Sequence, residues 1–414
     1  MRTDLFMTVS ELCKTAKLNS ATIAYFPQAK ANALLQTVAS AIRTNVYYLL
    51  DENARDVDVC NSGQLVDLIR LNRTSVESLA RKLERMMGMP SPLGEILEQY
   101  QTPNGMEICK LRVPLGTVGI LFEDDVSFLV ESVGMCLKTG NAVAIMGNER
   151  VTYTVRALVK VIKEGIAAFP MNAEFVQGID FSKRNLSEFL RANDSLDAVI
   201  CKGEKQLKAF VKENATVPVI MTGNARSQVY IESSANVLMA THLLVNSVTE
   251  NTNAPYACKG LVVDESIARS FLPFALGILR EKGVIVKGDK RAKSFLPDLP
   301  LATDRDFLEG ASDLLTVRIV RDISDAIAYI NIVSSHVCDM IVTKNISFAE
   351  RFVNEVDSAI VYVNASTSFT DGYEFGIGED LGVSVQKIHA RGLIGLRELT
   401  SVKYRVLGNG QIRN

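Results

Sequence analysis

The chain has 414 residues, of which 47% are hydrophobic and 22% are charged. Its 45 Lys and Arg residues are balanced by 47 Asp and Glu residues, so the chain has no global basic field to hold nucleic acid or anionic lipid. The length exceeds the size at which one core keeps growing, and we expect two or more domains. No stretch of 18 apolar residues occurs, which predicts a cytoplasmic protein without a membrane or nucleic-acid partner.

The cysteines and histidines are not spaced as in disulfide-bonded folds or metal sites. The seven cysteines, at positions 13, 60, 109, 136, 201, 258 and 338, contain no C-x-x-C pair. The three histidines, at 242, 336 and 389, are equally scattered. We therefore expect neither disulfides nor a metal site.

The first hundred residues show helical patterns. After Pro27, apolar residues recur at helical spacing at positions 34, 35, 38, 42, 46 and 49. Further on, Thr74 and Glu77 have the spacing of a capping box ahead of Leu79 and Leu83. This part of the chain is predicted to be a helical layer.

A hairpin signal then interrupts the helices. Asn104-Gly105 is a typical hairpin turn, and residues 106–113 alternate in polarity before Pro114. The pattern predicts a protruding two-stranded flap. The late segment 401–411 reads as one more strand, which we expect to pair with the flap of a neighbouring subunit, because that pairing would use both exposed edges.

From Thr117 onward, short apolar runs alternate with segments long enough for helices. The first series of predicted strands is 117–122, 141–146, 174–179, 196–201 and 217–220, and the second is 259–264, 283–288, 314–320, 339–344 and 359–364. Helices are expected from Ser266, Ile323 and Ser347. This alternation is typical of parallel sheets and predicts an α/β fold with two doubly wound domains.

Chemistry is expected at the carboxyl ends of such strands. Cys258, beside the strand 259–264, could be a nucleophilic thiolate there, although a buried cysteine is more often an inert small apolar residue. Cys136 lies on a helix face with Val133 and Leu137 and reads as core. The turn 201–205 joins a strand to a helix, where a pyrophosphate could rest on the helix N-terminus.

The tail from Asp357 to Arg413 combines a strand with small hydroxyl residues, the Asp371-Gly372 turn and glycines at 376, 378 and 382. Glycine permits close backbone approach, and hydroxyls with free N–H groups can cradle an anion. The segment reads as a ligand-facing loop. A long surface turn is the alternative interpretation.

Five segments carry a resemblance to a known family. They are SPLGEIL at 91–97, CLKTGNAV at 136–143, VKENATVPVI at 211–220, residues 255–258 and the tail. In order along nearly the whole chain, they resemble the gamma-glutamyl phosphate reductase family of the aldehyde dehydrogenase superfamily. The resemblance implies NADPH-dependent reduction of glutamyl 5-phosphate in proline biosynthesis.

The resemblance also assigns roles to domains. It implies a cofactor-binding domain at 1–98 and 114–236, a catalytic domain at 237–397, and an oligomerisation element at 99–113 and 398–414. A homodimer or homotetramer is expected, with glutamate kinase as a candidate partner.

Site residues follow from the same resemblance. Cys258 matches the nucleophile, and Ser127 stands at the oxyanion position. Lys202, Gly203 and Gly147 would contact the cofactor, and the substrate would meet Asn364, Ser366, Thr367, Thr370, Asp371 and Gly372.

Several positions depart from the family pattern. Asp125 replaces an arginine, Ser127 an asparagine, Glu204 a glycine and Ser368 an arginine, and Met146 stands where a basic residue is expected. Two hypotheses therefore stay open. One is a working reductase, for the same acyl phosphate or a less anionic acyl substrate; the other is a non-catalytic paralogue that binds glutamate kinase or an active reductase.

Overall fold

The computed structural model describes residues 7–60, 63–169, 171–223, 226–252, 254–308 and 313–413. The chain divides into two compact units. Unit 1 comprises Met1–Thr222, Ile377–Leu381 and Ile394–Asn414, and unit 2 comprises Gly223–Gly376 and Gly382–Leu393. Among the described residues, no helix combines the length and apolar character needed to cross a bilayer.

Unit 1 begins with a helical layer. Its helices are α1 (Val9–Asn19), α2 (Gln28–Thr44), α3 (Val46–Val59), α4 (Gly63–Ile69) and α5 (Arg73–Met87). The apolar spacing predicted one helical run through residue 49, but the run is broken between α2 and α3 at Asn45, whose side-chain amide donates to the Ala41 carbonyl at 3.0 Å. Buried Leu34, Leu35, Val38 and Ile42 form the inner face of α2.

The predicted capping box of α5 was wrong by two residues. Asn72 is the N-cap, because its extended backbone lets its side chain accept from the Ser75 N–H at 2.9 Å while Ser75 accepts in return at 2.7 Å. Glu77 instead accepts hydrogen bonds from Arg43 and Arg81.

The first sheet of unit 1 is parallel and five-stranded. Its strands are β3 (Thr117–Phe122), β4 (Ala142–Gly147), β5 (Val176–Gly178), β6 (Ala198–Lys202) and β7 (Val219–Met221), in the order β5-β4-β3-β6-β7. The helices between them are α6 (Val126–Lys138), α7 (Thr152–Ala167), α8 (Lys183–Phe189) and α9 (Lys205–Asn214). The chain reverses direction across the sheet between β3 and β6, which makes their carboxyl ends the switch point.

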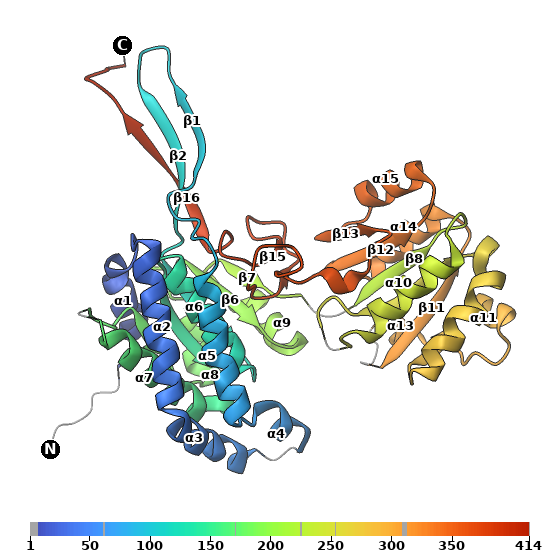
Figure 1. The fold of residues 1–414 in the computed structure, drawn as a ribbon, viewed down its shortest axis with the longest axis horizontal. Coiled ribbons are helices and arrows are strands. Elements are labelled where there is room, and N and C mark those ends of the chain that lie inside the picture. The colour runs from blue at the N-terminus through green and yellow to red at the C-terminus, as the bar shows by residue number, and fades with distance from the viewer. Residues whose placement is uncertain are drawn as a thin grey trace. The chain divides into compact units, whose positions relative to one another are not determined.

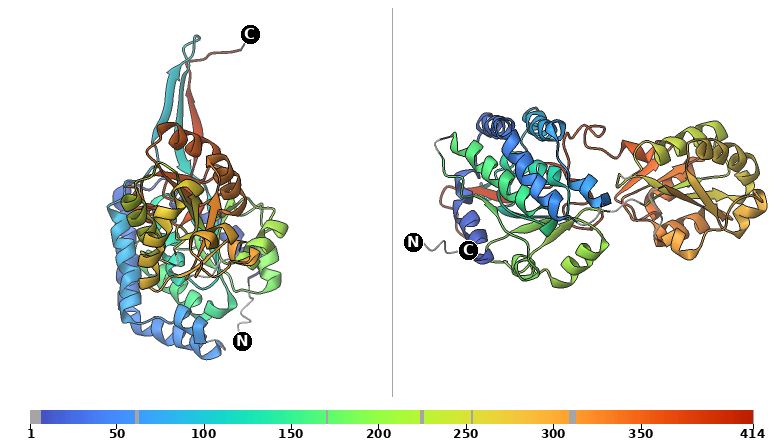
Figure 2. Two further views of the ribbon diagram at one scale, coloured as in Figure 1. Left: turned by 90° about the vertical axis from the view of Figure 1, so that its right-hand side faces the viewer. Right: turned by 90° about the horizontal axis from the view of Figure 1, so that it is seen from below.

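Unit 2 contains a six-stranded parallel sheet in the order β10-β11-β9-β8-β12-β13. Its strands are β8 (Ser227–Ile231), β9 (Cys258–Asp264), β10 (Ile285–Gly288), β11 (Leu314–Val320), β12 (Cys338–Val342) and β13 (Ile360–Val363). The helices are α10 (Val237–Thr249), α11 (Glu265–Glu281), α12 (Lys290–Phe295), α13 (Asp304–Leu308), α14 (Ile323–Val333) and α15 (Ile346–Glu355). Helices α10 and α11 pack on one face, and α14 and α15 on the other (Figures 1 and 2).

Strand β8 was missed in the sequence, and it moves the division between the units. Sequence analysis placed residues up to 236 with the first domain, whereas β8 lies inside the second sheet between β9 and β12. All five of its residues are buried, so β8 is a core strand although it begins with the polar residues Ser227 and Gln228. The division after Thr222 therefore precedes the predicted boundary.

The flap and the late strand form a three-stranded antiparallel sheet. Its members are β1 (Ile96–Gln101), β2 (Glu107–Pro114) and β16 (Thr400–Leu407), and it projects from the rest of unit 1 (Figure 1). The expected pairing with a neighbouring subunit's flap is corrected, because β16 pairs with β2 of its own chain from Thr400–Pro114 to Leu407–Glu107. One edge of β16 is left open within the sheet.

Lys138, the last residue of α6, is 1% exposed, and its ammonium group donates to Asn32 at 2.8 Å. Burial lowers the pKa of Lys138 from 10.5 to about 8. A lysine whose pKa is lower in the folded state destabilises the fold where both states are protonated. Its contribution to the free energy of unfolding should therefore rise between pH 8 and 10.5.

Lys138→Met should raise the free energy of unfolding at pH 7 by about 1 to 3 kcal/mol, because the charge leaves an apolar site while most of the packed volume is kept. Urea denaturation at pH 7 and pH 10 measures the effect, and the gain over wild type should shrink at pH 10. Lys30→Met, at an exposed lysine on α2, is the control. An equal gain at both pH values would contradict the assignment.

Candidate active site

Cys258 is the first residue of β9 and is 1% exposed. Its thiol donates to the Gly260 carbonyl at 3.3 Å, and its side chain belongs to the apolar cluster beneath α10 and α11. The expectation that the cysteine lies at the carboxyl ends of the strands was wrong, since the first residue of a parallel strand lies at the amino edge of its sheet. The loop that precedes β9 thus decides what can approach the thiol.

Burial raises the pKa of the Cys258 thiol to about 12, against smaller opposing contributions from the Gly260 hydrogen bond and the Lys259 charge. At pH 7 the thiolate fraction is then roughly one in 10⁵. Because the thiolate is the nucleophile, the thiol is unreactive in this environment unless a neighbour takes its proton.

A cavity of about 250 Å³ adjoins Cys258. It lies where the end of α10, the turn after α11 and the start of β11 meet, and its lining comprises Val248, Thr249, Thr252, Cys258, Lys259, Lys282, Gly283, Val284, Asp313 and Leu314. Lys259 is 9% exposed and its ammonium group donates to the Thr252 carbonyl at 2.8 Å. A nucleophile candidate, two cations and one carboxylate therefore share one small space.

The amino edge continues from Cys258 through Ser227 to Cys338. Cys258 and Ser227 are register partners, and the Ser227 hydroxyl lies 3.1 Å from the Cys338 sulfur. Burial raises the pKa of the Cys338 thiol to about 12 as well. The second cysteine is thus a packed neighbour in this row.

Asp339, which sequence analysis missed, ties the loops of this edge together. It is fully buried and accepts from the Gln228 N–H and the Ser334 hydroxyl, each at 2.6 Å, and from the Ser358 hydroxyl. Burial raises the pKa of Asp339 to about 7. In the sequence, the available signal for Asp339 was a single acidic residue at the start of an apolar strand.

The tail loop returns to α10. The Ser366 hydroxyl lies 2.9 Å from that of Ser247, and the Thr367 N–H donates to Ser247 at 3.2 Å. Thr370 lies 2.9 Å from the Tyr362 hydroxyl. Ser366, Thr367 and Thr370 are each at most 2% exposed, and the hydroxyls of Ser366 and Thr370 already have partners within the protein.

At the tip of this loop, Asp371 accepts from the Tyr373 N–H at 2.8 Å and so forms the predicted turn. Gly372 is buried beside it. The Thr367 hydroxyl has no hydrogen-bond partner among the described residues.

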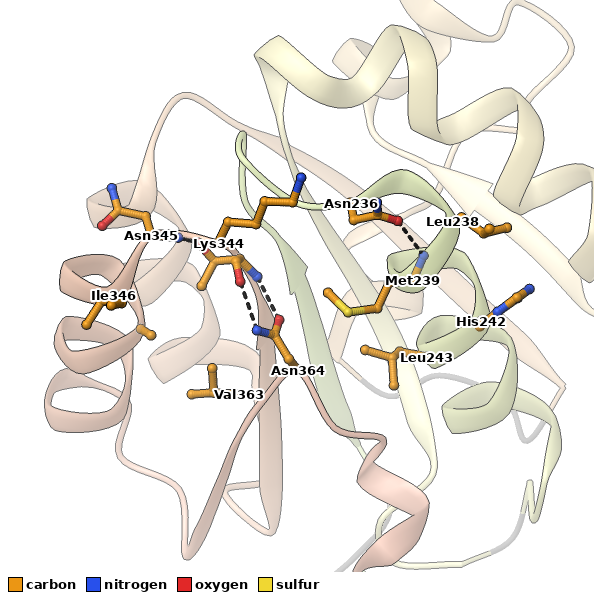
Figure 3. Close-up of a pocket in the computed structure, with 12 residues that line it drawn as sticks. Asn236, Leu238, Met239, His242, Leu243, Lys344, Asn345, Ile346, Val363 and Asn364 are labelled. Atoms are coloured by element: carbon orange, nitrogen blue, oxygen red, sulfur yellow. Dashed lines mark hydrogen bonds between the residues drawn. The ribbon is translucent and has the colours of Figure 1, made fainter.

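Asn364 lies apart from these residues. It follows β13 at the carboxyl edge of the sheet, with a φ of 54°, and its amide exchanges hydrogen bonds of 2.8 and 2.9 Å with the Thr343 backbone (Figure 3). It lines a cavity of about 840 Å³ whose walls include Leu238, Met239 and Ile346. Because all six strands are parallel, Asn364 and the start of β9 lie at opposite edges of the sheet.

In unit 1, the switch point is rich in carboxylates that already have partners. Asp125 caps α6 by accepting from the N–H groups of Ser127 at 3.0 Å and Phe128 at 3.3 Å, and it accepts from the Lys202 ammonium group at 2.8 Å. Burial alone would raise the pKa of Asp125, but Lys202 and the backbone donors outweigh it and lower that pKa.

Ser127 lies in the first turn of α6, at the predicted oxyanion position. Its hydroxyl donates to Glu131 at 3.0 Å, and Glu131 also accepts from Lys82. Both the hydroxyl and the N–H of Ser127 therefore serve carboxylates in this structure.

The two glycines expected to meet a dinucleotide are packed against side chains of the protein. A Cβ at Gly203 would lie 2.7 Å from Leu207 and 2.9 Å from Glu123, and one at Gly147 would lie 2.7 Å from Val155. The N-cap of α9, Glu204, makes no side-chain capping bond, but its N–H donates to the Glu123 carboxylate at 2.5 Å, so this helix end already holds an anionic group. Arg150, a cation at the same edge, is held by Asp124 through hydrogen bonds of 2.7 and 2.9 Å and is therefore already paired.

Asp125→Ala should lower the free energy of unfolding by about 1 kcal/mol, because α6 loses its N-cap. Asp125→Asn keeps an acceptor for the cap and loses only the half-exposed ion pair, which should cost less. Urea denaturation of both variants measures the two losses in the free energy of unfolding. Equal losses would show that the ion pair with Lys202, and not the cap, is the larger contribution.

Comparison with known proteins gives consistent likenesses. The chain matches the aldehyde dehydrogenase family over residues 7–277. It is 39% identical to the gamma-glutamyl phosphate reductase of Moorella thermoacetica over 390 residues, 93% of each chain, and 37% identical to that of Clostridium perfringens over 406 residues, 97% of this chain and 98% of that protein. The crystal structure of gamma-glutamyl phosphate reductase from Thermotoga maritima matches with a TM-score of 0.95 at 32% identity, over 99% of this chain and 100% of that chain.

Proposed function

Since the chain belongs to the aldehyde dehydrogenase family, among its gamma-glutamyl phosphate reductases, we propose that it reduces L-glutamyl 5-phosphate to L-glutamate 5-semialdehyde with release of phosphate. The observation that carries this function is the likeness to these reductases over nearly the whole chain, in sequence and in fold. The oxidoreductase class and the place in proline biosynthesis follow from the same relatives.

Cys258 is the proposed nucleophile. Its sulfur would bond to the acyl carbon while the carbon–oxygen bond to phosphate breaks, and phosphate would leave with the electron pair. Ser127 is the proposed oxyanion donor, and its hydroxyl would have to leave Glu131 to act. Ser366, Thr367, Thr370, Asp371 and Gly372 are the proposed substrate contacts, whereas Asn364, at the opposite edge of the sheet from Cys258, is not among them.

NADPH is the proposed cofactor, and it would supply a hydride to the thioester carbon. Lys202 would pair with a phosphate, and the backbone of Gly203 and Gly147 would lie beside the cofactor. Arg150 is the further cation at this edge. Each cation would exchange a carboxylate partner, Asp125 or Asp124, for the cofactor phosphate.

A second candidate function is favoured by one observation, the burial of Cys258. A thiol with a pKa of about 12 inside an apolar cluster suits a core position. In that case the chain would keep the reductase fold to bind glutamate kinase or an active reductase subunit.

Purified protein with enzymatically generated glutamyl phosphate and NADPH should show reductase turnover, and Cys258→Ala should abolish it, with a loss of about 10³-fold or more. Cys338→Ala is the matched control, because it removes an equally buried thiol of the same sheet edge and should retain turnover. NADH is measured in parallel. Wild-type turnover no greater than that of Cys258→Ala would favour the non-catalytic function.

We also propose a homodimer or homotetramer built through the three-stranded sheet, in a reducing cytoplasm that suits seven free cysteines. Val406, Ile108 and Tyr100 form one apolar row across β16, β2 and β1. Val406 is 52% exposed and Tyr100 51%. An exposed apolar row on a projecting sheet is typical of a protein–protein contact surface.

Val406→Lys should weaken subunit association by about tenfold or more, because it places a charge in the apolar row. Size-exclusion chromatography with light scattering over a dilution series measures the change. Leu18→Lys, at an exposed leucine of α1, is the control and should leave the mass unchanged. An unchanged oligomer in Val406→Lys would place the interface elsewhere.

A further inference from the structure

A cavity beside Cys258 gives a small molecule room to meet this thiol. Its volume of about 250 Å³ lies below the range of drug-sized sites, so it suits a fragment of a few heavy atoms. Its walls combine apolar Val248, Val284 and Leu314 with the charged groups of Lys259, Lys282 and Asp313.

We propose that this cavity admits a short acyl chain bearing a carboxylate to Cys258, and that Lys259 accepts the thiol proton as the sulfur attacks. The proposal rests on the proposed function and names the subsite and the proton acceptor for it. Lys282 is the cation that would meet the carboxylate of the chain, because Lys259 has to be a neutral amine to accept the thiol proton.

Lys259 is suited to this role by its placement. It lines the same cavity as Cys258, is 9% exposed, and its ammonium group reaches the Thr252 carbonyl in the cavity wall. Burial lowers the pKa of Lys259, so more of it is the neutral amine that can take a proton. Its charge also favours the Cys258 thiolate.

The proton transfer is balanced within the pair. The sulfur–hydrogen bond of Cys258 breaks, its proton bonds to the Lys259 nitrogen, and the electron pair stays on sulfur. When the product leaves and the carbon–sulfur bond breaks, the thiolate takes the proton back. Asp339 and Cys338 face Cys258 and oppose the thiolate, whereas Asp313 favours the protonated form of Lys259.

Alkylation of the intact protein tests the proposal without the substrate or the cofactor. Wild type is treated with iodoacetamide or iodoacetate from pH 7 to pH 10, and each cysteine is followed by peptide mass spectrometry. Cys258 should be labelled in the folded protein. Its ratio of iodoacetate to iodoacetamide rates should exceed that of Cys60, a half-buried cysteine in unit 1.

Three variants separate proton acceptance from charge. Lys259→Met should slow labelling of Cys258 at pH 8 by about ten- to a hundredfold and leave Cys60 unchanged. Lys259→Arg should keep the preference for iodoacetate but lose the rate, because guanidinium does not give up its proton. Lys282→Met should reduce only the iodoacetate preference, and thermal melts check that each variant is folded.

Labelling of Cys258 only as fast as the fully buried Cys338, at the rate of global unfolding, would overturn the proposal. So would a Cys258 rate unaffected by Lys259→Met in a folded variant. Turnover of glutamyl phosphate by a chain whose Cys258 resists labelling would retain the reductase and reject the cavity. Labelling that depends on Lys259 without turnover would retain the cavity and reject the reductase.

Discussion

The parallel arrangement of the six strands of unit 2 decides which residues can act together. Every strand begins at one edge, so Cys258, Ser227 and Cys338 share the amino edge, while Asn364 and its cavity lie at the other. The loops before β8, β9 and β12 therefore form the surroundings of the thiol. Buried Asp339 of β12 joins β8 to the segments before β12 and β13, because it accepts from the Gln228 N–H and from the hydroxyls of Ser334 and Ser358. A shift in any one of them would strain the hydrogen bonds of the others.

In unit 1, the charged side chains at the edge of the apolar sheet form ion pairs with one another. The carboxylates of Asp124 and Asp125 hold Arg150 and Lys202 where an anionic ligand would otherwise find two free cations. These ion pairs are partly exposed and are worth about 0 to 1 kcal/mol each. A phosphate that makes charge-assisted hydrogen bonds of about 1.5 to 3 kcal/mol can displace such carboxylates. The acidic departures from the family pattern therefore weaken anion binding less than their formal charges suggest.

Local pattern predicted most strands, and the fold class with them, because buried parallel strands are short apolar runs between helices. The strand at 117–122 is an example, and its predicted bounds equal those of β3. Strand β8 was missed because its first two residues are polar and find partners only in the folded sheet, where Ser227 meets Cys338. The amino-edge position of Cys258 was missed for a related reason. A run of letters predicts that a strand exists, but whether a side chain is a core residue depends on the helices that cover it.

Two opposing effects of burial determine what Cys258 can do. Raising the thiol pKa from 9.0 to about 12 costs the thiolate roughly 4 kcal/mol. The low dielectric responsible for that cost also strengthens attraction between a thiolate and a neighbouring ammonium group, which reaches several kcal/mol at contact distance. Lys259, itself mostly buried, lines the same cavity as Cys258 and becomes such an ammonium group when it accepts the thiol proton. Burial therefore disfavours the charged form of each group taken alone. Proton transfer from Cys258 to Lys259 would create two opposite charges, whose attraction in the buried site offsets part of that cost.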